Sequence, residues 1–152
     1  MKPGTRWTSG TKRFLTFLLR LALGSVLVYA GFSKYSHPYQ FAEIIIAYQL
    51  LPHPLVGLTA AIVPWVEMVS GALLILGIKP RSCLLLIQIV LLIFMMVLAV
   101  TMLRGLNIDC GCGLFSERQV GFLALLEDGL LLALAGWLYR VEIKRVLPAP
   151  YL

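Results

Sequence analysis

Four long stretches of apolar residues, separated by short polar segments, dominate the pattern along the chain. They cover residues of about 14–34, 55–78, 82–103 and 119–139. Each stretch is long enough for a helix, rising about 1.5 Å per residue, to cross a hydrocarbon layer of about 30 Å. Transmembrane strands alternate apolar and polar residues, and these stretches do not. The pattern therefore predicts an all-α integral membrane protein, a four-helix bundle that forms a single domain over residues 1–152.

The longest connection joins the first two apolar stretches and contains a second helical pattern. Pro38 suits the first turn of a helix, whereas Pro52 and Pro54 prevent its continuation. Apolar residues recur between these prolines at helical spacing: Phe41, Ile44, Ile45 and Tyr48. We expect a short interfacial helix on the outer side of the membrane, apolar face down, which is either an anchored loop or a substrate-gating lid. In this position Phe41 and Tyr48 are candidates for contact with a protein partner.

Composition and charge support a membrane location and indicate an orientation. Hydrophobic residues make up 60% of the 152 residues and charged residues 13%, which is more apolar surface than a soluble domain of this length can bury. The net charge of +6 does not indicate nucleic-acid binding, because most basic residues flank the same ends of the spans. These residues are Lys2, Arg6, Lys12, Arg13, Lys79, Arg81, Arg140, Lys144 and Arg145. The positive-inside rule then places both termini in the cytoplasm.

The amino terminus has a basic segment followed by an apolar run, as a secretory signal peptide does. This run is long for a signal peptide, and its removal would leave three spans with the termini on opposite sides. We therefore interpret residues 14–34 as a retained span.

Two of the three cysteines, Cys110 and Cys112, lie one residue apart between the third and fourth spans, on the outer side of the membrane in this orientation. Residues i and i+2 have Cα atoms about 5.5–7 Å apart, which overlaps the range for a disulfide. A bond closing so small a loop would be strained and easily reduced, as in redox-active pairs. Inert thiols, a local structural bridge and a metal site remain alternatives.

A metal site is the weakest of these readings, because two thiolates supply half of a tetrahedral shell. His37 and His53 would have to complete it from another loop. The third cysteine, Cys83, lies near the cytoplasmic end of span three and is expected to be a small buried hydrophobic residue.

Ionisable residues inside the spans indicate function or a specific pairing, because charge in hydrocarbon is costly. Counting from the outer ends of their spans places Glu67 about 18 Å deep and Arg20 about 20 Å deep, with Gln88 near the same level. This predicts a buried pair between Arg20 and Glu67, with Gln88 beside it. In the alternative, Arg20 extends to the inner interface.

Two adjacent carboxylates, Glu127 and Asp128, lie about 11 Å below the outer surface in span four. Their side chains point about 100° apart, so that one of them can face the bundle axis. Such a pair should titrate as a coupled unit and suits a proton relay that serves the outer thiols. Hydrogen bonding to Tyr29 or Ser33 of span one is the alternative.

Small residues recur along the spans and predict close helix approach. The glycines among them are Gly24, Gly31, Gly57, Gly71, Gly77 and Gly136. This pattern concerns packing and carries no chemistry of its own.

Three motifs, in this order and with these separations, resemble the MauE branch of the MauE/DoxX family of four-helix membrane proteins. They are "YAGFSKYSHPYQFAEIIIAYQLLP", "PWVEMVSGALLILGIKPR" and "RGLNIDCGCG". The resemblance implies a redox-associated inner-membrane protein, since MauE members are linked to maturation of the disulfide-rich methylamine dehydrogenase small subunit, alongside a thioredoxin-like partner. It also implies that Cys110 and Cys112 match the family's Cys-Gly-Cys and that Glu67 matches its membrane carboxylate. The family's usual Cys-Gly-Cys-Phe-Gly appears here as Cys-Gly-Cys-Gly-Leu-Phe.

These observations favour thiol–disulfide exchange between the cysteine pair and a periplasmic thioredoxin-like protein. A membrane quinone is the obvious second electron carrier, although no cofactor motif supports it. A non-enzymatic anchor or assembly subunit, held in the membrane by its lipid contacts, is a second hypothesis. A small transporter with a site at Glu67 and Arg20 is a third, and with four spans it would require a homo-oligomer.

Overall fold

The structure, a computed structural model, describes residues 9–105 and 122–146. These residues form five helices: α1 (Ser9–Ser36), α2 (Pro38–Ala47), α3 (His53–Leu76), α4 (Pro80–Leu103) and α5 (Phe122–Val146). Four of them are long and apolar enough to cross a membrane, over Arg13–Ser36, His53–Leu76, Pro80–Leu103 and Phe122–Ile143. The predicted all-α, four-helix membrane bundle is confirmed.

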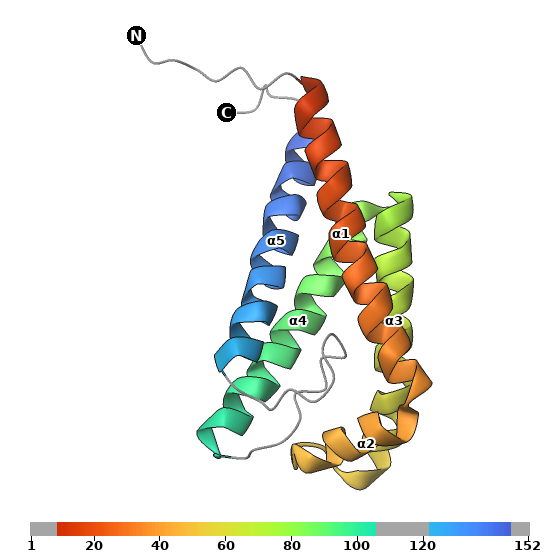
Figure 1. Cartoon of the computed structure of the whole chain (residues 1–152), viewed down its shortest axis with the longest axis vertical. Coiled ribbons are helices and arrows are strands. Elements are labelled where there is room, and N and C mark those ends of the chain that lie inside the picture. Colours follow the sequence, from red (N-terminus) through yellow and green to blue (C-terminus); the bar gives the residue numbers. More distant parts are fainter. Residues whose placement is uncertain (1–8, 106–121, 147–152) are drawn as a thin grey trace.

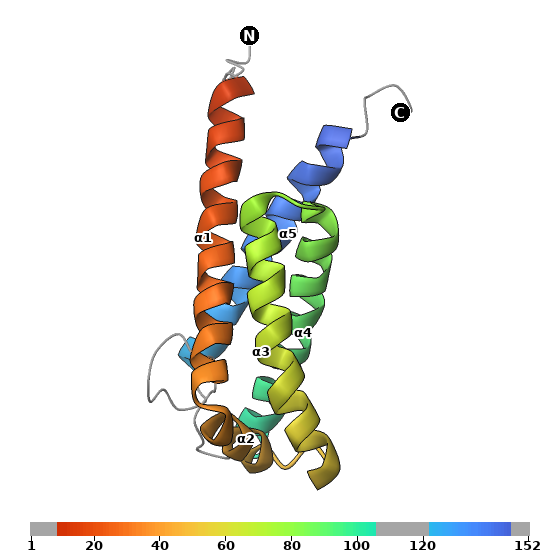
Figure 2. The ribbon, with the colours of Figure 1, turned by 90° about the vertical axis from the view of Figure 1, so that its right-hand side faces the viewer.

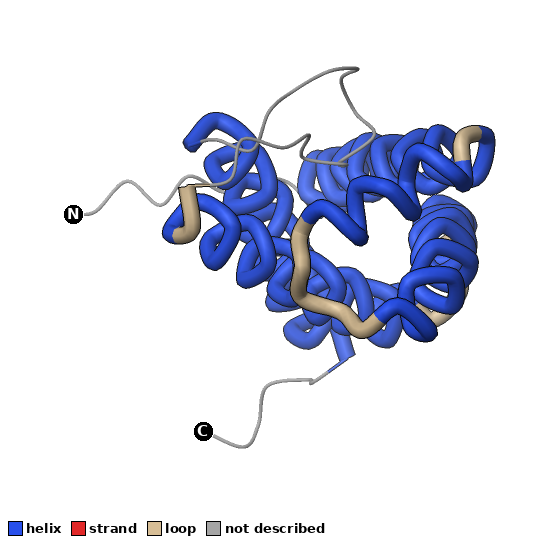
Figure 3. The backbone as a smooth tube through the Cα atoms, turned by 90° about the horizontal axis from the view of Figure 1, so that it is seen from below, coloured by secondary structure: helices blue, strands red, loops and turns tan. Residues whose placement is uncertain are grey.

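The four long helices run alternately in opposite directions and form a ring in which α1 contacts α3 and α5, and α4 contacts α3 and α5. The short helix α2 crosses one end of the bundle, below α1 and α3 in Figures 1 and 2. We call this the α2 end; the opposite end, where α1 begins and α5 ends, is the distal end. Helix α4 ends and α5 begins at the α2 end (Figure 1). Viewed from the α2 end in Figure 3, the described residues are helices joined by short loops.

Helix α2 forms where the sequence predicts a short helix. Pro38 occupies its first turn, and the chain leaves the helix through Gln49, whose φ of 53° is left-handed. Phe41 and Ile45 are buried against Val56 and Ala60 of α3. The apolar face of α2 therefore points into the protein, as expected.

The prediction that Phe41 and Tyr48 contact a partner is wrong. Phe41 is 6% exposed, and Tyr48 is 5% exposed in a cluster with Leu98 of α4 and Ala124 of α5. The apolar face that would attract a partner is already covered by the bundle. The aromatic residue that α2 does present to the outside is Tyr39, which is 85% exposed.

Small residues allow α1 and α3 to make the most extensive helix contact in the bundle. A Cβ atom on Gly24 would lie 2.8 Å from the carbonyl oxygen of Gly71, and one on Gly31 would lie 2.7 Å from that of Pro64. Both are closer than real Cβ contacts allow, so a larger residue would force the helices apart. The packing role is confirmed for these glycines. Gly57, by contrast, has open space around it, and Gly77 ends α3 in a left-handed conformation.

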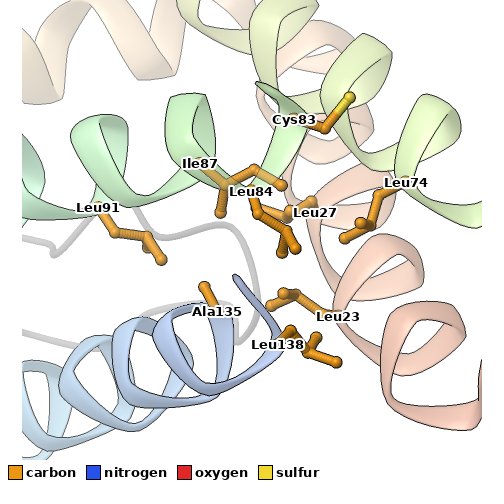
Figure 4. Close-up of a cluster of buried hydrophobic side chains, with 9 residues drawn as sticks. All are labelled: Leu23, Leu27, Leu74, Cys83, Leu84, Ile87, Leu91, Ala135 and Leu138. Carbon is orange, nitrogen blue, oxygen red and sulfur yellow. The ribbon is translucent and has the colours of Figure 1, made fainter. Parts of the chain in front are cut away.

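An apolar core fills the distal half of the bundle. Its members come from all four long helices and are labelled in Figure 4: Leu23, Leu27, Leu74, Cys83, Leu84, Ile87, Leu91, Ala135 and Leu138. Many other large apolar side chains on the spans face outward, among them Leu85, Ile93 and Leu130. In a membrane these outward residues meet lipid, which explains how a chain with so few charges can expose them.

Candidate functional site

Charged residues interrupt the buried stripes of α1 and α5. The buried stripe of α1 runs through Leu23, Leu27 and Ala30 and continues into Lys34. The stripe of α5 runs through Ala124, Asp128, Ala135, Leu138 and Glu142. Because each stripe faces the bundle interior, these charged side chains must find partners inside the protein. They form two separate groups, one on each side of the apolar core.

At the α2 end, Lys34 pairs with Glu67 of α3. The Lys34 Nζ donates hydrogen bonds to both carboxylate oxygens, 2.8 Å to Oε1 and 2.7 Å to Oε2. The two side chains are 5% and 12% exposed, so the pair is nearly enclosed. The Lys34 Nζ also lies 5.8 Å from the centre of the Phe41 ring, which helps to offset the lost hydration of the ammonium group. Helix α2 thus covers a buried ion pair.

The predicted pair between Arg20 and Glu67 is wrong. The contact between α1 and α3 sets Gly31 against Pro64 and Met68, on either side of Glu67, and sets Arg20 near Gly77 instead. Arg20 therefore lies about 16 Å further along α1 than the residue that faces Glu67, at about 1.5 Å per residue. Counting depth from the ends of the spans missed this offset. Lys34, one turn beyond Gly31, reaches Glu67 in its place.

Arg20 pairs instead with Glu142 of α5 in the distal half of the bundle. Both side chains are largely buried. Glu142 lies at the end of the candidate span Phe122–Ile143, so Arg20 extends towards that end of the bundle, the direction of the alternative prediction. Arg81 of α4 joins the group, because its Nη2 donates a hydrogen bond of 3.1 Å to the backbone carbonyl of Glu142. The Arg20–Glu142 pair links the first and last spans at that level.

Gln88 lies away from both ion pairs. Its Nε2 approaches α5, 4.0 Å from where a Cβ on Gly136 would stand, and it is buried without a hydrogen-bond partner among the described residues. The expected grouping of Gln88 with Arg20 and Glu67 is therefore wrong. Cys83 is buried at the edge of the apolar core, as predicted, and its Sγ donates to the carbonyl of Ile78.

The two adjacent carboxylates of α5 divide as their helical angle predicts. Asp128 is 3% exposed and faces the interior, whereas Glu127 is partly exposed. Asp128 interacts electrostatically with Glu127, Lys34 and Glu67, so it belongs to the group at the α2 end. Its Oδ2 is buried and has no hydrogen-bond partner among the described residues. Tyr29, one of the proposed partners in span one, is largely exposed.

Sequence reasoning missed two members of these groups, Lys34 and Glu142. Lys34 is the last residue of the span predicted over 14–34 and was assigned no partner, and Glu142 lies beyond the predicted end of span four at residue 139. The available signal was periodicity: Lys34 stands seven residues after Leu27, and Glu142 four after Leu138, which places each on the buried face of its helix.

Lys34, Glu67 and Asp128 form the candidate site. Lys34 and Glu67 are in direct contact, and Asp128 of a third helix is near enough to interact with both electrostatically. An ammonium group and two carboxyl groups are the functional groups needed to hold and transfer a proton. The second ion pair lies about 21 Å away along α1, as the separation of Lys34 and Arg20 shows. The apolar core fills the space between the two pairs.

The cysteine pair predicted to do redox chemistry lies outside the described residues. Cys110 and Cys112 belong to the segment 106–121 that joins α4 to α5. The described residues on both sides of that segment lie at the α2 end, the same end as Lys34, Glu67 and Asp128 (Figure 1).

Comparisons with known proteins agree with this architecture. The family model described as "Methylamine utilisation protein MauE" matches residues 12–140. The methylamine utilization protein MauE of Paracoccus denitrificans is similar to this chain, with 31% identity over 119 residues. The aligned region makes up 77% of this chain and 64% of that relative, so the chain spans less than two thirds of the relative's length. No solved structure matches the chain significantly.

Proposed function

Since this chain belongs to the methylamine utilisation protein MauE family, we propose that it is a bacterial inner-membrane protein that exchanges disulfides through Cys110 and Cys112. Its partner is a periplasmic thioredoxin-like protein, and the exchange supports the maturation of disulfide-containing proteins, including those of methylamine utilisation. The observation that carries the proposal is the spacing Cys110-Gly-Cys112, which allows the two sulfurs to form one strained, readily reduced bond.

The exchange is balanced within the two proteins. A thiolate of one pair attacks the disulfide of the other, and a mixed disulfide forms as one sulfur leaves as a thiolate. The second thiol of the attacking pair then attacks the mixed disulfide, forms a disulfide within its own pair and releases the other protein as a dithiol. Two electrons and two protons pass between the pairs, so that one becomes a disulfide and the other a dithiol. Two cysteines suffice for this, and Cys83 is not required.

The distribution of basic residues supports a periplasmic location for the cysteine pair. Arg13, Lys79, Arg81 and Arg140 lie towards the distal end of the bundle. At the α2 end the charge of Lys34 is neutralised by Glu67, which leaves Arg104 as the exposed cation on the described residues of that side. The positive-inside rule then favours a cytoplasmic distal end and a periplasmic α2 end.

Trapping of the mixed disulfide tests the proposal. Each of the Cys112→Ser and Cys110→Ser variants lacks one thiol of the pair. The variant that lacks the resolving thiol should accumulate a covalent adduct with a thioredoxin-like protein, visible on non-reducing gels and lost on reduction. Cys83→Ala is the matched control and should behave as the unmodified chain, because Cys83 is buried in the apolar core. Full activity in disulfide maturation without adducts in both single variants would contradict the proposal.

A non-enzymatic assembly subunit is the second candidate, and the exposure of Tyr39 favours it. This side chain projects from α2 and is 85% exposed, beside the buried residues that anchor the helix. In this function Tyr39→Ala should weaken association with the soluble partner while the cysteine variants retain it. If Tyr39→Ala leaves the association unchanged and the cysteine variants lose it, the assembly subunit is excluded and disulfide exchange is retained.

A further inference from the structure

The buried charges at the α2 end do not cancel. Lys34 contributes one positive charge, and its hydrogen bonds to both oxygens of Glu67 make that pair neutral. Asp128 brings a second carboxyl group into the same group, where it is 3% exposed. If all three groups were ionised, one negative charge would remain in the interior. An unpaired carboxylate is strongly disfavoured away from water, because no partner replaces its hydration.

The surroundings of Asp128 offer it no second cation among the described residues. The charged groups that act on it are Glu127 on its own helix, Glu67 on α3 and Lys34 on α1, and the lysine is already engaged by Glu67. Two of these three neighbours repel a negative charge. The described residues of α1, α3 and α5 therefore supply no further cation that would balance the negative charge of Asp128.

The remaining two helices contribute uncharged groups to this region. Helix α4 places Leu98 and Thr101 on its buried face, and the Thr101 hydroxyl donates its proton to the carbonyl of Val97. Helix α2 contributes Tyr48, packed against Leu98 and Ala124, while its carboxylate Glu43 is exposed. The Oδ2 of Asp128 consequently remains an enclosed acceptor with no donor among the described residues.

We propose that Asp128 is a proton-binding site, at which one exchangeable proton is held on the carboxyl group while Lys34 and Glu67 remain an ion pair. Protonation makes the group of three neutral and turns the unpartnered acceptor into a hydroxyl donor. The three members of the proton site lie on α1, α3 and α5, so the proposal is argued without the cysteine pair. It also distinguishes Asp128, which is buried, from Glu127, which is partly exposed.

Charge balance, more than burial alone, sets the number of protons, and this gives an expected count for each variant. Asp128→Asn removes the site and should leave no buried protonated carboxyl group. Glu67→Gln leaves Lys34 to neutralise Asp128, so the proton should be lost although Asp128 is intact. Lys34→Met removes the cation, so a second carboxyl group should become protonated. Glu127→Gln is the matched control and should keep one proton.

Infrared spectroscopy of the full chain in phospholipid nanodiscs at neutral pH measures these counts. A protonated carboxyl group has a carbonyl stretching band, separate from that of carboxylates, that shifts when H2O is exchanged for D2O. The unmodified chain and Glu127→Gln should show one such band, Asp128→Asn and Glu67→Gln none, and Lys34→Met a larger one. If Asp128→Asn does not fold, Glu67→Gln and Lys34→Met still test the charge count.

Two results would overturn the proposal. One is a band that persists in Asp128→Asn, because the proton would then reside elsewhere, or in Glu67→Gln, because charge balance would then not set the count. The other is the absence of a band in the unmodified chain, whether or not its thermal stability depends on sodium in the buffer. A sodium-dependent stability in that case would identify an alkali cation, in place of the proton, as the species that balances Asp128.

Discussion

Replacement of Lys34 by methionine removes the cation of the buried ion pair while keeping much of the side-chain volume. Both oxygens of Glu67 then lose their donor in an almost enclosed position. Breaking a buried pair by removing one partner costs about 3–5 kcal/mol. The Glu67 carboxylate can avoid part of this cost by taking up a proton. The free energy of that protonation is therefore an upper limit on the destabilisation. For a carboxyl group with an ordinary pKa of about 4.3, protonation at pH 7 costs about 3.7 kcal/mol, from about 2.7 pH units at about 1.36 kcal/mol each.

The free energy of unfolding of Lys34→Met should therefore fall by about 3–4 kcal/mol at pH 7. It can be measured by reversible unfolding in mixed micelles, followed by far-UV circular dichroism. In the variant the folded state binds more protons than the unfolded state, so lowering the pH stabilises the folded state. At pH 5 the destabilisation should shrink to about 1 kcal/mol, from about 0.7 pH units.

Two comparisons make this test specific. Arg104→Met removes an exposed cation at the end of α4 and should change stability by about 1 kcal/mol or less. The double variant Lys34→Met/Glu67→Met replaces the pair by apolar side chains and should recover most of the lost stability. A loss in Lys34→Met that is the same at pH 5 and pH 7, or no loss at either, would refute the role given to the buried pair.

Three further predictions concern stability measured in the same unfolding assay. Gly31→Ala should destabilise the bundle by about 1–3 kcal/mol, because its Cβ would meet the Pro64 carbonyl. The control Gly57→Ala, in open space, should be neutral or stabilising. Equal effects of the two substitutions would contradict the close approach of α1 and α3. Phe41→Ala should lower the free energy of unfolding by about 3–5 kcal/mol, because Phe41 is buried, and Tyr39→Ala by about 0.5 kcal/mol or less, because Tyr39 is exposed. The reverse order would show that α2 is not anchored by its apolar face. Arg20→Met should cost about 3–5 kcal/mol by removing the cation that pairs with the largely buried Glu142, and unchanged stability would exclude that pair.

The fold was predictable from the sequence because each span carries its own signal. A continuous apolar run has one low-energy form in lipid, a helix, and Pro38, Pro52 and Pro54 mark the short helix between the first two spans. The division of Glu127 and Asp128 was also predictable, since adjacent residues on a helix must point in different directions. These features depend on residues close together in the sequence.

The partners of the charged residues were not predictable in the same way. Pairing depends on the axial offset between helices, which is set here by Gly24 and Gly31 packing against α3. Counting depth from the ends of the spans ignored that offset and therefore predicted an ion pair between Arg20 and Glu67. In the structure each of these buried cations pairs with a carboxylate at its own level along the bundle, Lys34 with Glu67 and Arg20 with Glu142.

The most direct test of the proposed function is the labelling of Cys110 and Cys112 in intact cells with a membrane-impermeant maleimide, before and after treatment with an impermeant reductant. We expect the label on both residues to increase after reduction, without permeabilisation of the inner membrane, while Cys83 stays unlabelled in its buried position. Labelling of the pair only after permeabilisation would place it in the cytoplasm. Labelling that reduction does not change would show that the two sulfurs form no disulfide, and either result would contradict periplasmic disulfide exchange.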